Sequence, residues 1–237
     1  MTDSPRLLLS LLLATSCCLL VFGSAPTPRR RITKTLYLSN GLPWGNWGDT
    51  EFCEDKSFAA YVEAKFEPYA ALDADETALN ALILYCVSLE TGLPTGHIAS
   101  TVGVKGELQG MKICTHGFIT AIRARVLKSQ GTFGDDVAIQ NFQIECDRSY
   151  IINAVDGQRD SRIPLGEWGE WSACPDGSAI CGMEIRYNKV DALTDDAATS
   201  DAVFYCCALN DTLTRTNHRD TDEAGQGPGI HLHLVDQ

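Results

Sequence analysis

The sequence has few basic residues and, beyond its first part, no long apolar run. It has 237 residues, with 19 Lys and Arg against 31 Asp and Glu, and a formal net charge of −12. Such a chain lacks a basic surface large enough to neutralise a phosphate backbone, which excludes nucleic acid as a partner. After residue 24, no stretch approaches the roughly 20 apolar residues that a transmembrane helix needs, so we expect no membrane insertion.

The chemistry-bearing motifs of many enzymes are also missing. The sequence contains no His-x3-His, Cys-x2-Cys or Gly-x-Ser-x-Gly arrangement, which removes the usual zinc sites and the serine-hydrolase nucleophile. No apolar pattern at helical spacing is sustained either. These absences predict a protein without a cofactor or a metal, and with strands as its main elements.

The first residues have the features of a secretory signal peptide. Arg6 precedes an apolar region that continues to Phe22, and Val21 and Gly23 are small enough for the positions before a cleavage site. A membrane anchor is the alternative, but the apolar stretch is short and is followed at once by Gly, Ser and Pro. We therefore predict a signal peptide over residues 1–24, a short extension over 25–32, and a secreted, extracellular protein.

Cysteine usage agrees with an oxidising compartment. Of the ten Cys, Cys17 and Cys18 lie in the predicted signal peptide, and the remaining eight are an even number suited to disulfides. These eight recur along the chain, because Cys53, Cys114 and Cys174 are separated by 61 and 60 residues. The second set, Cys86, Cys146 and Cys206, is separated by 60 residues at each step.

This period divides the chain into three copies of one unit. The copies cover about residues 33–90, 91–150 and 151–207, and together they form one predicted domain, because no linker separates them. The stretch 208–237 is polar and charged, which predicts a flexible tail.

Equivalent positions in equivalent copies should meet in space, and this predicts the disulfide pairing. The first two copies give Cys53–Cys86 and Cys114–Cys146. In the third copy the register favours Cys174–Cys206 with Cys181–Cys207. The swapped pairing stays open, because Cys206 and Cys207 are neighbours.

Within each copy, apolar residues alternate with polar ones. Alternation runs from Phe58 to Phe66 and from Phe118 to Val126, and in the third copy it slips by one residue. Strict alternation indicates a strand with one buried face, so Val62, Ile122 and Ile185 are predicted to be buried. Three antiparallel units with one apolar face each can bury those faces only against each other. We therefore predict an all-β fold with three sheets around a shared core.

Two further patterns invite a functional reading. Asp pairs at 75–76, 135–136 and 195–196 stand between predicted strands, where turn chemistry explains them better than a metal site. The tryptophans Trp44, Trp47, Trp168 and Trp171 lie in Gly-rich segments. Stacking on sugar rings is one interpretation, but we favour packing into the core, with each indole N–H bonded to a carbonyl.

Several of these segments resemble the vitelline membrane outer layer protein 1 family. The resemblance rests on the run 41–47, on Asp-Glu-Thr-Ala-Leu-Asn at 75–80 and on the closing Cys206-Cys207, and it covers about residues 33–207. It implies a β-prism, with three four-stranded antiparallel Greek-key sheets around a pseudo-three-fold axis. The second copy departs from the family pattern, because it lacks the Trp-Gly-x-Trp element.

The resemblance also implies a role. Members are secreted proteins first known from the outer layer of the egg's vitelline membrane, so we expect a non-enzymatic structural component of an extracellular coat or secretion. Its expected partners are coat or secretion proteins, including basic ones. A single sequon at Asn210 predicts N-glycosylation.

Two alternatives stay open. One is a glycan-binding module, because β-prisms of other families are lectins. The other is a weak chito-oligosaccharide transglycosylase, an activity reported for one avian member of the family. Such an enzyme needs two carboxylates on either side of the glycosidic bond, and the candidates are Glu107, Glu167 and Glu170.

Overall fold

The computed structural model describes five stretches of the chain, residues 30–68, 77–128, 138–157, 166–189 and 198–210. The chain divides into two units, residues 1–30 and 31–237, and everything that follows concerns the second. Some expectations fall outside the described residues. They are the signal peptide, the three Asp pairs, and the tail from residue 211 on.

Sheet I is built from one continuous stretch of chain. In space its strands follow the order β6, β5, β4, and then β7 and β8, which both pair with β4. Three hairpin-connected strands and a fourth that returns beside the first make a Greek key. The strands are β4 (Ser57–Phe66), β5 (Leu79–Ser88), β6 (Pro94–Ile98), β7 (Glu107–Leu108) and β8 (Lys112–Ile113).

Sheet II repeats this plan with the next stretch of chain. Its spatial order is β11, β10, β9, and then β12 and β13, which both pair with β9. The strands are β9 (Ile119–Val126), β10 (Ile139–Cys146), β11 (Tyr150–Asn153), β12 (Glu167–Trp168) and β13 (Ser172–Ala173).

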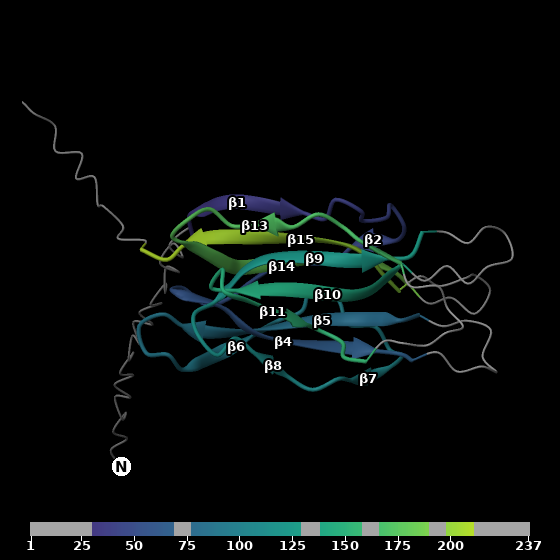
Figure 1. Ribbon diagram of the computed structural model, residues 1–237, viewed down its shortest axis with the longest axis horizontal. Coiled ribbons are helices and arrows are strands. Elements are labelled where there is room, and N and C mark those ends of the chain that lie inside the picture. Colours follow the sequence, from purple (N-terminus) through teal and green to yellow (C-terminus); the bar gives the residue numbers. More distant parts are fainter. Residues whose placement is uncertain (1–29, 69–76, 129–137, 158–165, 190–197, 211–237) are drawn as a thin grey trace, which may run out of the picture. The chain divides into compact units, whose positions relative to one another are not determined.

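Sheet III joins the start of the domain to its end. The last two strands pair with each other, β1 completes one edge beside β15, and β2 and β3 complete the other beside β14 (Figure 1). Each of the three copies therefore contributes strands to two sheets. The strands are β14 (Ser178–Asn188), β15 (Ala198–Ala208), β1 (Ile32–Tyr37), β2 (Asn46–Trp47) and β3 (Glu51–Phe52).

The predicted fold class is confirmed. Two short strands lie end to end on the same inner strand in every sheet, so each sheet has a four-strand layout whose outer strand is interrupted. The inward side chains of all three sheets form one apolar cluster. Val62, Ile122 and Ile185, one from each sheet, have no exposed surface, which confirms their predicted burial. Phe142 and Phe204 meet edge to ring at 6.1 Å between sheets II and III.

A β-bulge interrupts the alternation at the same point in each copy. Ala59 pairs with Cys86 and Tyr61 with Tyr85, which leaves Ala60 as the extra residue. The side chains beyond the bulge change face. Phe58 therefore packs in a second, smaller cluster with Ala179, Cys181 and Cys207, and not in the main core. The expected unbroken alternation from Phe58 to Phe66 is wrong at this point.

The bulges explain the slip in the third copy and also hold the cysteines. The bulged residues are Ala60, Thr120 and Cys181. The carbonyl of each accepts a hydrogen bond from the backbone N–H of Cys114, Cys174 and Cys53, respectively, at 2.8–2.9 Å. The extra residue thus supplies an acceptor that sets the position of each cysteine.

Glycines let neighbouring sheets approach each other. A Cβ on Gly48 would lie 2.1 Å from Thr101 Oγ1, and a Cβ on Gly169 would lie 2.4 Å from Asn40 Oδ1. Asn40 comes from the segment after β1, and its Nδ2 donates to the carbonyls of Ala124 and Glu167 in sheet II. The Gly that follows each Trp therefore leaves room for a side chain from the next sheet.

The hairpin of sheet I uses a different contact. Gln109 follows Leu108 where the other two sheets have Gly after Trp. The seam to sheet II is spanned there by an ion pair between Lys112 Nζ and Asp156.

Candidate functional site

Four disulfides tie the sheets together. The structure bonds Cys53 to Cys86, Cys114 to Cys146, Cys174 to Cys206, and Cys181 to Cys207, with Cα–Cα distances of 5.5–5.8 Å. Cys53 follows β3 of sheet III, and Cys86 lies in β5 of sheet I, so the first bond crosses from one sheet to the next.

The other two equivalent bonds continue the same connection. Cys114 follows β8 of sheet I and reaches β10 of sheet II, and Cys174 follows β13 of sheet II and reaches β15 of sheet III. Three bonds thus form a covalent ring around the prism, which we call the disulfide ring. Cys181–Cys207 lies within sheet III, between β14 and β15.

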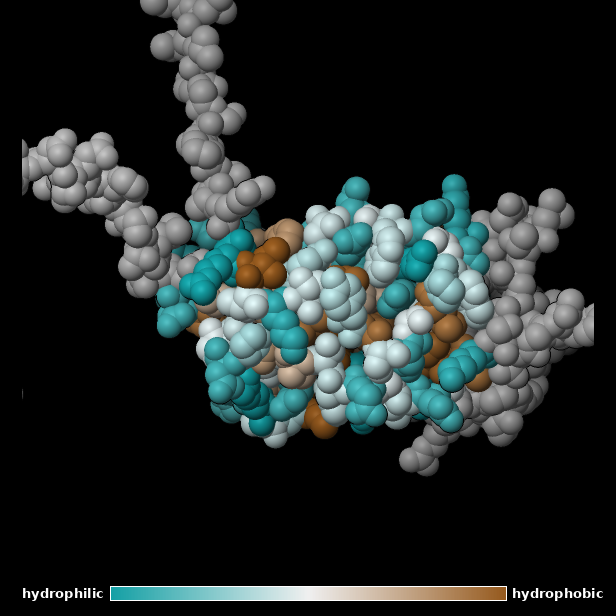
Figure 2. Space-filling view, turned by 90° about the horizontal axis from the view of Figure 1, so that it is seen from above, coloured by the Kyte–Doolittle hydropathy of each residue, from teal (hydrophilic) through white to brown (hydrophobic). Residues whose placement is uncertain are grey.

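A groove of about 380 Å³ opens where sheet III meets the segment after β6. One wall carries Trp47, with 40% of its surface exposed, and the facing segment 101–104 carries Val102 and Val104. Val104 is 83% exposed. Figure 2 shows apolar side chains as separate brown patches on a mostly hydrophilic face. The polar lining includes Asn46 and Lys189.

The groove is held by hydrogen bonds to its backbone. Lys65 Nζ donates to the carbonyls of Gly103 at 2.7 Å and Val104 at 3.0 Å. The Gly103 N–H donates to the carbonyl of Asn80 at 2.8 Å, and the hydroxyl of Tyr187 donates to Asn80 Oδ1 at 3.1 Å. These bonds fix both sides of the groove, so a ligand would meet a preorganised surface.

The tryptophans do not lie in the core, contrary to the favoured interpretation. Trp47 stacks on the guanidinium of Arg186 at 5.4 Å, and Trp168 stacks on that of Arg125 at 5.2 Å. Each indole is the Cα partner of its arginine on the neighbouring strand. The rings therefore cover the outer faces of sheets III and II, in a cation–π contact. The corresponding pair in sheet I is Leu108 with Lys65.

Two of the outer faces also carry a buried-edge carboxylate with a tyrosine partner. The hydroxyl of Tyr85 donates to Glu63 at 2.7 Å, and that of Tyr205 donates to Glu184 at 3.1 Å. The hydrogen bond to Glu63 raises the pKa of Tyr85, and burial, with the bond to Glu184, raises the pKa of Tyr205. The corresponding position of sheet II holds Arg123, whose Nε donates to Gln143 Oε1.

The three candidate carboxylates are exposed and lie on two sheets. Glu107 begins β7 of sheet I, opposite Phe66, and Glu167 begins β12 of sheet II, opposite Val126. Glu170 follows in the turn before β13, where its backbone N–H donates to Ser39 Oγ at 2.8 Å. Glu167 and Glu170 are thus close in sequence on one hairpin, while Glu107 belongs to another sheet.

The remaining expected features are few. Asn210 is exposed in the turn after β15, and the other two residues of its sequon lie outside the described residues. Within the described stretches, no three His, Cys, Asp or Glu side chains gather where they could hold one metal ion. The same stretches contain no helix with the length and apolar character that crossing a bilayer requires.

Three antiparallel Greek-key sheets around one core, tied by a disulfide ring, define a β-prism protein. A family profile described as vitelline membrane outer layer protein I matches residues 34–209. The human vitelline membrane outer layer protein 1 homolog (Homo sapiens) is 32% identical over 183 residues, which cover 76% of this chain and 85% of that protein. The mouse homolog (Mus musculus) is 30% identical over 181 residues, which cover 75% and 85%. The chain belongs to the vitelline membrane outer layer protein I family, which confirms the family resemblance.

Solved structures with the same general arrangement are lectins. A mannose-specific jacalin-related lectin from Morus nigra, in complex with mannose, aligns with a TM-score of 0.44 and 10% identity, over 78% of this chain and 99% of the lectin. A likeness at this identity and TM-score carries no information about a shared ligand.

Proposed function

We propose that the protein is a secreted, non-enzymatic structural component of an extracellular coat or secretion. The observation that carries this proposal is the disulfide ring, which joins all three sheets covalently. Disulfides persist only in oxidising compartments, and a closed set of buried cross-links slows the unfolding that exposes a chain to proteases. The acidic chain, with a net charge of −12, would attract basic coat proteins.

Deposition tests this role. Cells that express the full chain should release it into the medium, and antibodies should then find it in an extracellular layer of the source tissue. Salt should extract part of it, because screening weakens the attraction of an acidic surface for basic partners. A protein retained inside the cell would refute the proposal. So would steady turnover of chitin oligosaccharides that disappears when Glu107, Glu167 and Glu170 are changed together to Gln.

Glycan binding is a second candidate, and the groove at Trp47 is the observation that favours it. Ligand sites are concave, largely apolar and edged by a few polar groups, and this groove combines an exposed indole with Asn46 and Lys189. A flat aromatic face suits the C–H face of a pyranose ring, and the polar edge suits its hydroxyl groups.

The change Trp47→Ala tests this candidate. Loss of the indole should weaken binding to any glycan that the protein selects on an array by about tenfold or more, as for other buried-edge aromatic anchors. The matched control is Leu108→Ala, which shortens the corresponding residue of sheet I. Equal losses in the two variants, or no glycan bound by the unaltered protein, would eliminate the groove as a glycan site.

A further inference from the structure

One outer face differs from the other two in charge at an equivalent position. Glu63 of sheet I, Arg123 of sheet II and Glu184 of sheet III pair with Ile83, Gln143 and Val203 at the same point of their sheets. Two faces therefore present a carboxylate there, and sheet II presents a guanidinium. This reversal occurs in a chain whose net charge is −12.

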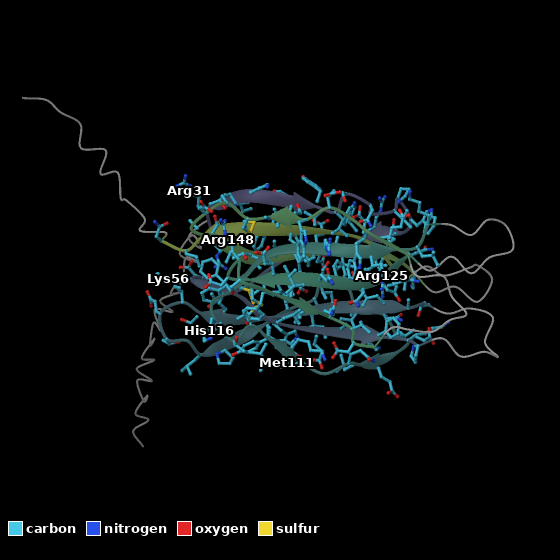
Figure 3. The ribbon with its side chains drawn as sticks, viewed as in Figure 1. Arg31, Lys56, Met111, His116, Arg125 and Arg148 are labelled. Carbon is cyan, nitrogen blue, oxygen red and sulfur yellow. A yellow bond between two sulfur atoms is a disulfide. The ribbon has the colours of Figure 1, made fainter. Side chains whose placement is uncertain are left out.

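Arg123 is held between two indole rings. Its guanidinium carbon lies 4.7 Å from the ring centroid of Trp171 and 5.2 Å from that of Trp168. Arg125 lies against Trp168 as well, at 5.2 Å. Two arginines and two tryptophans thus form a stack on the outer face of sheet II, which we call the Arg–Trp stack (Arg123, Arg125, Trp168 and Trp171). Figure 3 labels Arg125 at one end of this sheet and Arg148 toward the other.

The stack leaves the edge of the Arg123 guanidinium as its hydrogen-bonding surface. Its Nε donates to Gln143 Oε1 at 2.9 Å, and Gln143 is held in turn by Asn153 at 2.9 Å. None of the ion pairs among the described residues involves Arg123. The two terminal nitrogens form a planar fork that matches the oxygens of a sulfate or carboxylate. The rings fix the side chain, so little conformational entropy remains to be lost on binding.

We propose that the Arg–Trp stack binds an acidic polysaccharide, with a sulfate or carboxylate group on the Arg123 fork and sugar rings beside Trp168 and Trp171. Cations and flat apolar rings alternate along the stack, as anionic groups and pyranose rings alternate along such a polymer. A slender chain can follow this one face. An acidic folded protein would also meet the neighbouring faces, where Glu63 and Glu184 would repel it.

A carboxylate on the same face sets the sign of a second effect. Glu145 lies on the outward side of β10, two residues from Gln143, and is partly exposed. Its negative charge opposes an approaching anion, so neutralising it should strengthen binding. This site lies on sheet II, apart from the groove at Trp47, and does not depend on the proposed structural role.

Binding of the full chain to immobilised heparin at low and high salt tests the proposal. The unaltered protein should bind, and added salt should weaken the binding. Arg123→Gln should lower the affinity about tenfold, as expected for loss of a charge-assisted contact, and Glu145→Gln should raise it. The control is Arg148→Gln, which removes one positive charge from the far end of the same sheet, where Arg148 pairs with Asp176, and it should bind as the unaltered protein does.

Every other outcome overturns the proposal. Equal losses in Arg123→Gln and Arg148→Gln would mean attraction by overall charge alone. No binding to heparin at low salt would exclude the site. Polyglutamate that binds as tightly as heparin would show that the sugar rings contribute nothing, and a neutral chitin oligosaccharide that competes equally would show the same for the anionic groups. The gain expected for Glu145→Gln keeps the test valid if Arg123→Gln fails to fold.

Discussion

Replacing Ile122 by Asp is expected to prevent the protein from folding and being released by cells. Ile122 is fully buried and pairs with Ile144 in the middle of sheet II, where the three sheets share one core. A carboxylate there has no partner and no water. We expect a loss of more than about 4 kcal/mol of unfolding free energy, out of a total of about 5–15 kcal/mol for a typical domain. The amount of protein in the culture medium measures the effect.

The neighbouring position provides the control. Arg123 follows Ile122 on β9 and points to the outer face, where Arg123→Gln removes a contact with two indole rings. This variant should still fold and reach the medium, with a loss of about 1 kcal/mol in urea unfolding. Equal damage from Ile122→Asp and Arg123→Gln would mean that the inner and outer faces of sheet II are assigned wrongly.

The sequence predicts the fold class well because two periods act together. Alternation with a period of two identifies strands with one apolar side, and the spacing of about 60 residues shows that there are three similar sets of them. Neither period determines where one sheet ends and the next begins. The pairing of β1 with β15 joins residues about 170 apart in sequence, such as Leu36 and Phe204, and only the folded chain reveals it.

The outer faces were harder to predict. The tryptophans are large and apolar, so core packing was the favoured interpretation, but Trp47 and Trp168 lie on arginines instead. The arginines stand at the outward positions of the alternating strands, a signal that the sequence contains. Its use requires the pairing register that brings Trp168 opposite Arg125.

The groove was missed for a related reason. Trp47 belongs to sheet III, and the segment 101–104 follows the last hairpin strand of sheet I. These elements meet only because the first strands of the domain close the third sheet. No local pattern in the sequence indicates that contact.

Removing one bond of the disulfide ring should destabilise the protein strongly. With Cys114 and Cys146 both changed to Ala, a link that closes a loop of 32 residues is lost. The chain-entropy relation gives about 3–4 kcal/mol for a loop of this length, and urea unfolding of the oxidised variant measures it. Peptide mapping of the unaltered protein without reduction should find Cys114 joined to Cys146. A peptide that joins Cys53 to Cys114 would contradict the pairing from which this prediction starts.

The position of the lost bond should decide where the protein opens. Cys114–Cys146 crosses from sheet I to sheet II, whereas Cys181–Cys207 joins two strands of sheet III and closes a loop of similar size, with a separation of 26 residues. The two double variants should therefore lose similar unfolding free energy. Hydrogen exchange should differ, because the first variant frees the seam between β8 and β10, while the second loosens only β14 and β15. Faster exchange at the same amides in both variants would mean that the ring acts only on the unfolded chain and does not clamp the sheets.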